Sequence, residues 1–470
     1  MKKYIYIILI MITSGYCKPI TNISNSVVKI FNTRSTPNYK YPWQTGRLET
    51  IYGSGAIIKN NQILTAAHVV ANARLLQVKK ENDPKKYIAH IKYISHQADL
   101  ALLSIEDKNF FNNTKALKLS TNVKVRDKVT VIGYPIGGKN ISTTTGIVSR
   151  IEQVYYVYSA NQLLAIQIDA AINSGNSGGP TINAKNELIG IAMMRKAKAS
   201  NIGYIVPTQI INTFLEDTKD GKVDGFYKEN IFFQSIENTT LKHYYNLQDD
   251  NGILLFGLNS NNIDLKNNDI LLAIDGKNIA NNGTINTKYG RILFSYIFDT
   301  KQIRDIVTLD ILRNKKHITI HHKVEKIDYL INYEFAQQPR YIIYGGLVFT
   351  PITSNYLNTL RTLESNYIKK KLYAYIKNDE FSEAVTITST IFPHSVNRGY
   401  NSWGAVLKSV NGIKIKSFQH LVSVLEHIDT KYTRFEFLKN APIILNTQQA
   451  KQSFTDIKKI YRLNSYFYGL

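Results

Sequence analysis

Short apolar runs alternating with turn residues dominate the first half of the chain. Runs rich in β-branched residues lie at positions 27–31, 55–58, 63–64, 100–105, 128–132, 146–151, 163–168 and 188–193. Glycine, asparagine and proline separate these runs, and a clear helical period occurs only at residues 208–216. Many short strands divided by turn residues are typical of an all-β barrel or sandwich. We therefore expect a β-rich domain that ends in a helix.

Two further units with a common plan are predicted after a charged linker. In the first, strands are expected at residues 252–258 and 269–274 with an Asp-Gly turn, then a helix at 291–298 and a hairpin of 307–313 with 317–321. In the second, a strand at 405–410, an Asn-Gly turn, a helix at 418–428 and a strand at 434–438 follow one another. Because Asp-Gly and Asn-Gly pairs favour tight hairpin turns, both units read as small α+β domains.

The first residues have the layout of a secretory signal. Lys2 and Lys3 precede nine apolar residues at 4–12, and small or polar residues follow as far as Gly15. A run of this length is too short for a bilayer core, which needs about 20 residues. We expect a signal peptide over residues 1–17 and an exported, periplasmic protein of a bacterial cell envelope. Secretion, or a membrane tether through an uncleaved signal, is the alternative.

Length, charge and cysteine content limit the number of domains, the kinds of partner and the possible cross-links. A chain of 470 residues predicts two to four domains of about 100–200 residues each. The net charge is +23, but the basic residues are scattered and form no stripe that could track phosphates, so no nucleic-acid partner is predicted. Cys17 is the single cysteine, which excludes a disulfide within the chain. Stability must therefore come from core packing.

A glycine-rich turn around Ser177 is a candidate nucleophile loop. The sequence here is Gly175, Asn176, Ser177, then two glycines and a proline. Glycines let the backbone curl tightly, so the N–H groups of Gly175 and Ser177 could converge on one carbonyl oxygen as an oxyanion hole. Taken alone, such a turn is also compatible with an ordinary loop.

His68 and Asp99 supply the other two groups that a serine nucleophile requires. His68 follows an apolar strand and small residues, where an imidazole can face a cleft, although a single histidine in apolar surroundings is often a core residue. Asp99 introduces an apolar strand, and a carboxylate there is costly to bury without a partner. The chain order His, Asp, Ser within one β-rich domain is that of the chymotrypsin arrangement. Together they predict a serine protease.

Metal and cofactor chemistry have no comparable pattern in the sequence. His321 and His322 are adjacent on a predicted strand, so their side chains would point to opposite faces. No metal-ligand spacing and no phosphate-binding glycine loop competes with the serine constellation. We predict neither a metal nor a cofactor.

From about residue 26 onward the chain resembles the HtrA/Deg proteases, most closely their plant-type Deg branch. The resemblance rests on segments 53–57, 64–70, 98–103, 133–138, 146–150, 169–180 and 201–207, and continues at 265–276, 345–351 and 406–425. It implies a mainly β protein: a chymotrypsin-like double β-barrel followed by two α+β PDZ-like domains, the second one divergent. The boundaries expected are 18–216 for the protease domain, 217–224 for a linker, 225–332 for PDZ domain 1, 333–375 for a connector, 376–445 for PDZ-like domain 2 and 446–470 for a tail.

The resemblance also implies a function and a set of site residues. His68, Asp99 and Ser177 match the family's triad, and Gly175 and Asn176 match its oxyanion loop. Residues of the primary specificity pocket would be Ile202, Gly203, Tyr204 and Ile205, which suggests small aliphatic side chains in substrates. The implied activity is ATP-independent endoproteolysis of unfolded or damaged polypeptides by a homotrimer or larger homo-oligomer.

One departure from the family's pattern affects the first PDZ domain. PDZ domains usually bind a C-terminal carboxylate through a small glycine-containing loop. The corresponding residues here are 228–231, where Glu229 places a negative charge near a site for an anion. We therefore expect a regulatory or assembly role for this domain. A chaperone or PDZ scaffold with a latent protease site remains the alternative function.

Overall fold

The computed structural model describes residues 23–469 except 136–137, 139, 160, 196–201, 228–230, 248, 259–264, 327, 361–371, 373–376, 379 and 402–403. The predicted signal peptide and Glu229 lie outside these described residues. Within them, no helix is long and apolar enough to cross a membrane.

Six strands form the first closed barrel, in the order β1-β2-β3-β6-β5-β4. Their bounds are β1 (Val27–Ser35), β2 (Leu48–Ile58), β3 (Gln62–Thr65), β4 (Ala73–Lys80), β5 (Tyr87–Ser95) and β6 (Leu100–Ile105). The strands pair antiparallel, and the second half of β2 is buried throughout. The short helix α1 (Ala67–Val70) follows β3 directly and carries His68.

A second closed barrel has the order β10-β11-β12-β9-β8-β7. Its strands are β7 (Lys128–Gly133), β8 (Ser142–Tyr155), β9 (Gln162–Ile168), β10 (Pro180–Asn183), β11 (Leu188–Arg195) and β12 (Gly203–Pro207). Helix α2 (Thr208–Asp217) follows, as its apolar period predicts, and buries Ile210, Ile211 and Phe214. One hydrophobic cluster joins Leu64 and Leu102 of the first barrel to Ile166 and Ile191 of the second, so the barrels share a core.

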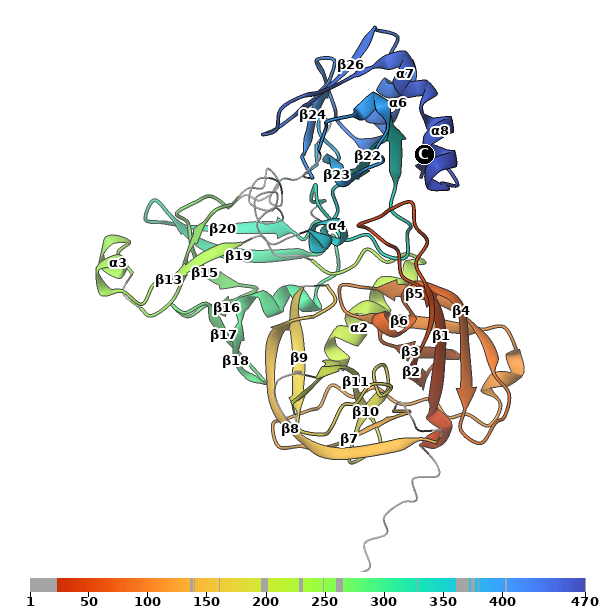
Figure 1. Ribbon diagram of the computed structural model, residues 1–470. Coiled ribbons are helices and arrows are strands. Elements are labelled where there is room, and N and C mark those ends of the chain that lie inside the picture. Colours follow the sequence, from red (N-terminus) through yellow and green to blue (C-terminus); the bar gives the residue numbers. More distant parts are fainter. Residues whose placement is uncertain are drawn as a thin grey trace, which may run out of the picture.

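The next domain packs against the second barrel. Its main sheet has the order β13-β14-β15-β19-β20, with β16 paired to β15, and a separate hairpin joins β17 to β18. The elements are β13 (Phe232–Ser235), α3 (Thr239–Tyr244), β14 (Ile253–Phe256), β15 (Ile270–Ile274), β16 (Lys277–Asn278), β17 (Thr284–Thr287), β18 (Gly290–Leu293), the 3-10 helix η5 (Phe294–Thr300), β19 (Ile306–Arg313) and β20 (Lys316–Lys323). Figure 1 shows this domain beside β8 and β9.

The last domain contains two four-stranded sheets, ordered β23-β22-β21-β28 and β25-β24-β26-β27. Its elements are β21 (Tyr341–Tyr344), β22 (Leu347–Pro351), α4 (Ser354–Thr359), β23 (Val385–Ile391), β24 (Leu407–Val410), β25 (Ile413–Lys414), α6 (Phe418–His427), β26 (Tyr432–Phe437), β27 (Ile443–Asn446), α7 (Thr447–Gln452), α8 (Phe454–Tyr461) and β28 (Phe467–Tyr468). Residues 341–351, expected within a connector, form β21 and β22 of this domain, and β22 pairs with β23.

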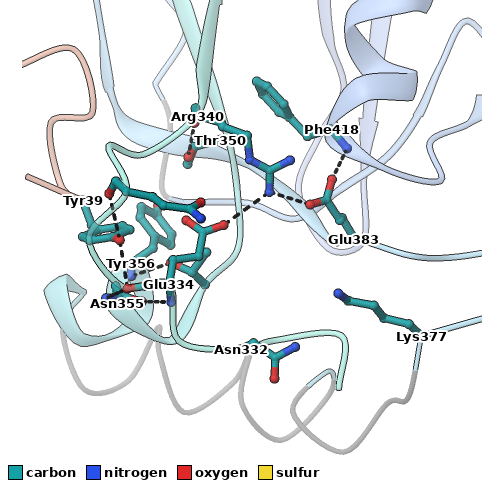
Figure 2. A network of polar contacts seen from close by, with 12 residues as sticks. Tyr39, Asn332, Glu334, Arg340, Thr350, Asn355, Tyr356, Lys377, Glu383 and Phe418 are labelled. Atoms are coloured by element: carbon teal, nitrogen blue, oxygen red, sulfur yellow. Dashed lines mark hydrogen bonds and ion pairs between the residues drawn. The ribbon is translucent and has the colours of Figure 1, made fainter. Parts of the chain in front are cut away.

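Contacts from the β1–β2 loop tie the first barrel to the last domain, toward which the loop extends in Figure 1. The Tyr39 hydroxyl donates to the carbonyl oxygen of Glu334 at 3.1 Å, beside an ion-pair network in which Arg340 holds both Glu334 and Glu383 (Figure 2). In the same loop, Trp43 packs edge-on against Phe392, with 4.8 Å between ring centroids. Side chains from the β1–β2 loop therefore hold the first barrel and the last domain together.

Most of the predicted elements are confirmed, although residues 341–351 are strands and the expected tail contains α7, α8 and β28 of the last domain. The Asp-Gly and Asn-Gly turns join β15 to β16 and β24 to β25, and α6 matches the helix expected at 418–428. The helix predicted at 291–298 is wrong: its first residues form β18, where Ile292 pairs with Ile285 of β17, and η5 begins at Phe294. Cross-strand pairing of apolar side chains thus prevails over the helical spacing.

Candidate active site

His68 and Asp99 meet through two hydrogen bonds at the edge of the first barrel. The His68 ring nitrogen Nδ1 lies 2.7 Å from Asp99 Oδ2, and the His68 backbone N–H donates to Asp99 Oδ1 at 2.9 Å. Asp99 lies in the connection between β5 and β6 with a φ of +54°, a conformation that aspartate tolerates better than most residues. Its side chain is 1 % exposed, so the carboxylate is buried with both oxygens bound to one partner residue.

The turn that carries Ser177 belongs to the second barrel but is docked onto the first. Buried Ser54 of β2 makes the connection: its N–H donates to the Ser177 carbonyl oxygen at 2.9 Å, and its hydroxyl donates to the Gly175 carbonyl oxygen at 2.7 Å. The same hydroxyl accepts the Tyr134 N–H at 2.9 Å. Sequence patterns did not single out Ser54, because these partners are remote in the chain.

Gly178 shows how closely the turn approaches the strand that leads to His68. With a φ of +81°, it adopts a left-handed conformation, and a Cβ at this position would lie 2.2 Å from Thr65 Oγ1 and 3.0 Å from the Ala66 nitrogen. Only glycine fits this approach without displacement of the neighbouring backbone. The turn therefore contacts Thr65 and Ala66, which lie three and two positions before His68 in the sequence.

The backbone of the turn leaves two N–H groups free for an acceptor. The N–H of Asn176 donates to Asn173 and that of Gly178 donates to Ala192, at 2.9 and 2.8 Å. Within the described residues, the N–H groups of Gly175 and Ser177 have no acceptor. Gly175 has a φ of +100°, which orients its peptide in a way that other residues rarely reach. These are the two donors that the sequence suggested for an oxyanion.

His68 and Ser177 approach each other from opposite barrels, but no hydrogen bond joins their side chains in the described part of the chain. Ser177 is half-buried, and the His68 side chain is 14 % exposed. A ring that sequence reasoning missed covers one face of the imidazole: Tyr158 stacks on it with 4.3 Å between centroids and 11° between planes. The imidazole of His68 is thus bound by Asp99 and partly covered by Tyr158.

The residues expected at the specificity pocket lie on or next to β12. Tyr204 and Ile205 are buried, and the Tyr204 hydroxyl donates to Glu152 Oε1 at 3.1 Å and to Gln167 Oε1 at 3.2 Å. Gly203 lies against the side chain of Ile172, and Ile202 packs partly buried on the barrel core. Ile205 pairs with Ala192, whose carbonyl oxygen accepts the Gly178 N–H, so β12 is one strand away from the turn that carries Ser177.

The connection before Asp99 also contacts the two later domains. Gln97 Oε1 accepts the Phe226 N–H at 2.7 Å, and Gln97 Nε2 donates to the Phe226 carbonyl oxygen at 3.1 Å. His96 stacks on Phe335 with 3.8 Å between ring centroids, and its burial there lowers the pKa of the imidazole to about 4. Sequence reasoning missed both residues, because only the fold brings these partners together.

A buried carboxyl group joins the domain after the linker to the second barrel. Asp299 Oδ2 in η5 accepts the Leu164 N–H at 2.8 Å and the Gln153 side-chain amide at 3.1 Å. Burial raises the pKa of Asp299 to about 8, and these two hydrogen bonds oppose the shift. Asp299 also lines a cavity of about 380 Å³ with aromatic walls that include Phe232 and Phe256. Glu229, expected in the carboxylate-binding loop of this domain, lies outside the described residues.

Two family models match the chain. A trypsin-like peptidase domain matches residues 53–191, and a PDZ domain matches residues 331–466. The first range contains His68, Asp99 and Ser177, and the second contains the last domain from β21 to α8, without β28.

Named relatives cover nearly all of the sequence. Protease Do-like 2, chloroplastic, of Arabidopsis thaliana is 34 % identical over 456 residues, which span 94 % of this chain and 74 % of that protein. Protease Do-like 4, mitochondrial, of the same plant is 34 % identical over 450 residues, which span 94 % of this chain and 84 % of that protein. The chain belongs to the HtrA/Deg protease family. It is a serine endopeptidase of the Do-like branch, as the sequence predicted.

Solved structures agree with the fold of this Deg protease. The HtrA-type protease AlgW with tripeptide aligns with a TM-score of 0.51 at 23 % identity, over 65 % of this chain and 95 % of that one. The predicted mainly β fold, with a chymotrypsin-like double barrel and PDZ-like domains, is confirmed.

Among the described residues, no group of three His, Cys, Asp or Glu side chains could hold a metal ion.

Proposed function

We propose that this Deg protease cleaves unfolded or damaged polypeptides, without ATP, through Ser177 as nucleophile, His68 as base and Asp99 as the carboxylate that orients the base. The observation that carries the proposal is the pair of hydrogen bonds from His68 to Asp99, at 2.7 and 2.9 Å. A buried carboxylate bound to Nδ1 fixes the tautomer in which Nε2 is free to accept a proton.

The chemical steps follow from this arrangement. Ser177 Oγ attacks the scissile carbonyl carbon while His68 Nε2 takes the hydroxyl proton, and the carbonyl oxygen becomes an oxyanion. The N–H groups of Gly175 and Ser177 would bind that oxyanion, each worth about 100- to 1,000-fold in rate. The imidazolium then protonates the leaving nitrogen, the C–N bond breaks, and water later hydrolyses the acyl-enzyme. In the resting enzyme the His68–Ser177 hydrogen bond is unmade, and such bonds often form only with substrate.

Substrate choice, assembly and location are further parts of the proposal. Residues 202–205 border the pocket for the side chain before the cut and favour small aliphatic groups. Substrates are misfolded chains of an exported compartment, the periplasm of a cell envelope, and the enzyme works as a homotrimer or larger assembly. The basic and apolar start of the sequence supports export, whereas the named relatives are chloroplastic and mitochondrial proteins, which favours an organelle over a periplasm.

A direct comparison of the wild type with Ser177→Ala tests the proposed function. Wild-type protein should digest unfolded casein, whereas Ser177→Ala should not, although its thermal unfolding should match the wild type. Equal digestion by both proteins would refute the assignment of the nucleophile.

A second candidate is a chaperone or PDZ scaffold with a latent protease site. The missing hydrogen bond between His68 and Ser177 favours it, because the site as described is not assembled for attack. It predicts suppression of aggregation by both the wild type and Ser177→Ala, with no digestion by either.

A further inference from the structure

Tyr158 is the residue of the β8–β9 connection that touches the catalytic base. Its ring lies nearly parallel to the His68 imidazole, 4.3 Å away, and burial against it raises the pKa of the phenol, with a smaller contribution from the Asp99 charge. Nevertheless 48 % of Tyr158 is exposed. One face of the ring therefore covers His68, while the rest of the residue is open to solvent.

The connection on both sides of Tyr158 is firmly anchored. Tyr156 is fully buried and its hydroxyl donates to the Leu164 carbonyl oxygen, and the Ser159 hydroxyl donates to the Gln97 carbonyl oxygen at 2.9 Å. The N–H of Tyr156 also donates to the Asn161 carbonyl oxygen at 2.8 Å, which closes the loop. These contacts fix the backbone on either side of Tyr158 next to His68.

The position of the loop indicates which part of a substrate it meets. A base that takes the Ser177 proton and passes it to the leaving nitrogen must lie beside the scissile bond, so substrate residues flanking the bond pass the imidazole. The β8–β9 connection enters β9 at Gln162, and the far end of that strand pairs with Gly203 and Tyr204 of β12. Since Tyr158 and the pocket proposed for the attacked residue both belong to the second barrel, we place the preceding substrate residue against the ring.

We propose that Tyr158 is a specificity-determining residue: it fills the subsite beside His68 and restricts the residue that precedes the attacked one to glycine, alanine or serine. This inference rests on the proposed function. A substrate side chain that is a few carbon atoms too large for a packed site typically lowers kcat/KM by about 10- to 150-fold relative to one that fits. A peptide with leucine or phenylalanine at this position should therefore have a kcat/KM at least about tenfold below that of the alanine peptide. Removing the ring should open the subsite.

Internally quenched peptides that differ only at this position provide the test. The wild type should cut the alanine peptide at least about tenfold better than the phenylalanine peptide. In Tyr158→Ala the ratio should fall to about threefold or less, through a lower KM for the phenylalanine peptide. Tyr158→Phe keeps the ring and should keep the wild-type ratio, as should Val157→Ala, a control at a neighbouring position of the same loop that is 69 % exposed.

Two results would overturn the inference, and they are distinguishable. If Tyr158→Ala lowers kcat for every peptide equally and leaves the ratio unchanged, the ring only supports His68 and sets no preference. If the wild type cuts no peptide and Ser177 resists a fluorophosphonate, the proposed function fails, and the inference fails with it. Labelling of Ser177 in the wild type, with an unchanged ratio in Tyr158→Ala, refutes the inference alone.

Discussion

Replacing Asp99 with asparagine tests the role of the buried carboxylate. Both carboxylate oxygens accept from His68, one from the backbone N–H and one from Nδ1. Asparagine offers one acceptor and one donor, so it can satisfy only one of the two. If its oxygen keeps the backbone N–H, its NH₂ group faces Nδ1, which must then accept. The ring proton moves to Nε2, and His68 can no longer take the Ser177 proton.

The opposite orientation of the amide is disfavoured by the structure. It would place NH₂ against the His68 backbone N–H and leave a buried donor without a partner, at a cost of about 1–3 kcal/mol. The wrong tautomer therefore prevails, and the imidazolium also loses its counter-charge. We expect kcat to fall by about 10⁴-fold at neutral pH, which corresponds to about 5 kcal/mol in the activation barrier.

The assay is steady-state hydrolysis of a fluorogenic peptide at neutral pH, with Ser177→Ala as the background rate. Asp127→Asn is a matched control, because Asp127 is an exposed aspartate that also accepts a backbone N–H, that of Lys124 at 2.7 Å. The control should keep full activity. If Asp99→Asn keeps kcat within tenfold of the wild type, while folded, the carboxylate does not select the tautomer and the reasoning is wrong.

Three further predictions concern the contacts that hold the site and the domains. Asp299 stays protonated in the folded chain up to about pH 8 but ionises near pH 4 when unfolded, so stability falls by at most about 1.4 kcal/mol per pH unit between these values. Asp299→Asn should flatten the corresponding decline of Tm between pH 5 and 8; an unchanged slope would contradict this. Ser54→Ala leaves the Gly175 carbonyl and the Tyr134 N–H unpaired and should cost about 1–3 kcal/mol for each, with a fall in kcat; unchanged unfolding and kinetics would refute the docking role. Arg340→Met leaves Glu334 and Glu383 without their shared cation and should destabilise the last domain by about 2 kcal/mol, measured by urea unfolding; an unaltered midpoint would show that the network in Figure 2 is not stabilising.

Features encoded over a few residues could be predicted from the sequence. The turn at 175–180, the strand boundaries beside His68 and Asp99, and the Asn-Gly and Asp-Gly hairpins all have strong local signals. One such signal was overlooked: Gly345 and Gly346, both with positive φ, join two apolar runs as a two-residue hairpin loop. The sequence of residues 341–351 therefore predicts a pair of strands joined by a tight turn.

Contacts between remote segments could not be predicted in this way. Ser54 looks like an ordinary strand residue, and its role arises only when the two barrels bring residues 54 and 175 together. Tyr158 and Asp299 likewise acquire their partners across 90 and 135 positions of sequence. In each case a single polar or aromatic side chain has no periodic pattern, so its partner follows from tertiary packing alone.

Labelling with a serine-directed fluorophosphonate, followed by mass spectrometry of the modified peptide, directly tests Ser177 as the nucleophile. We expect stoichiometric modification of wild-type protein at Ser177, and strongly reduced modification in His68→Ala, which lacks the proposed base but keeps the serine. Wild-type protein that digests casein while Ser177 stays unmodified would show that another residue is the nucleophile.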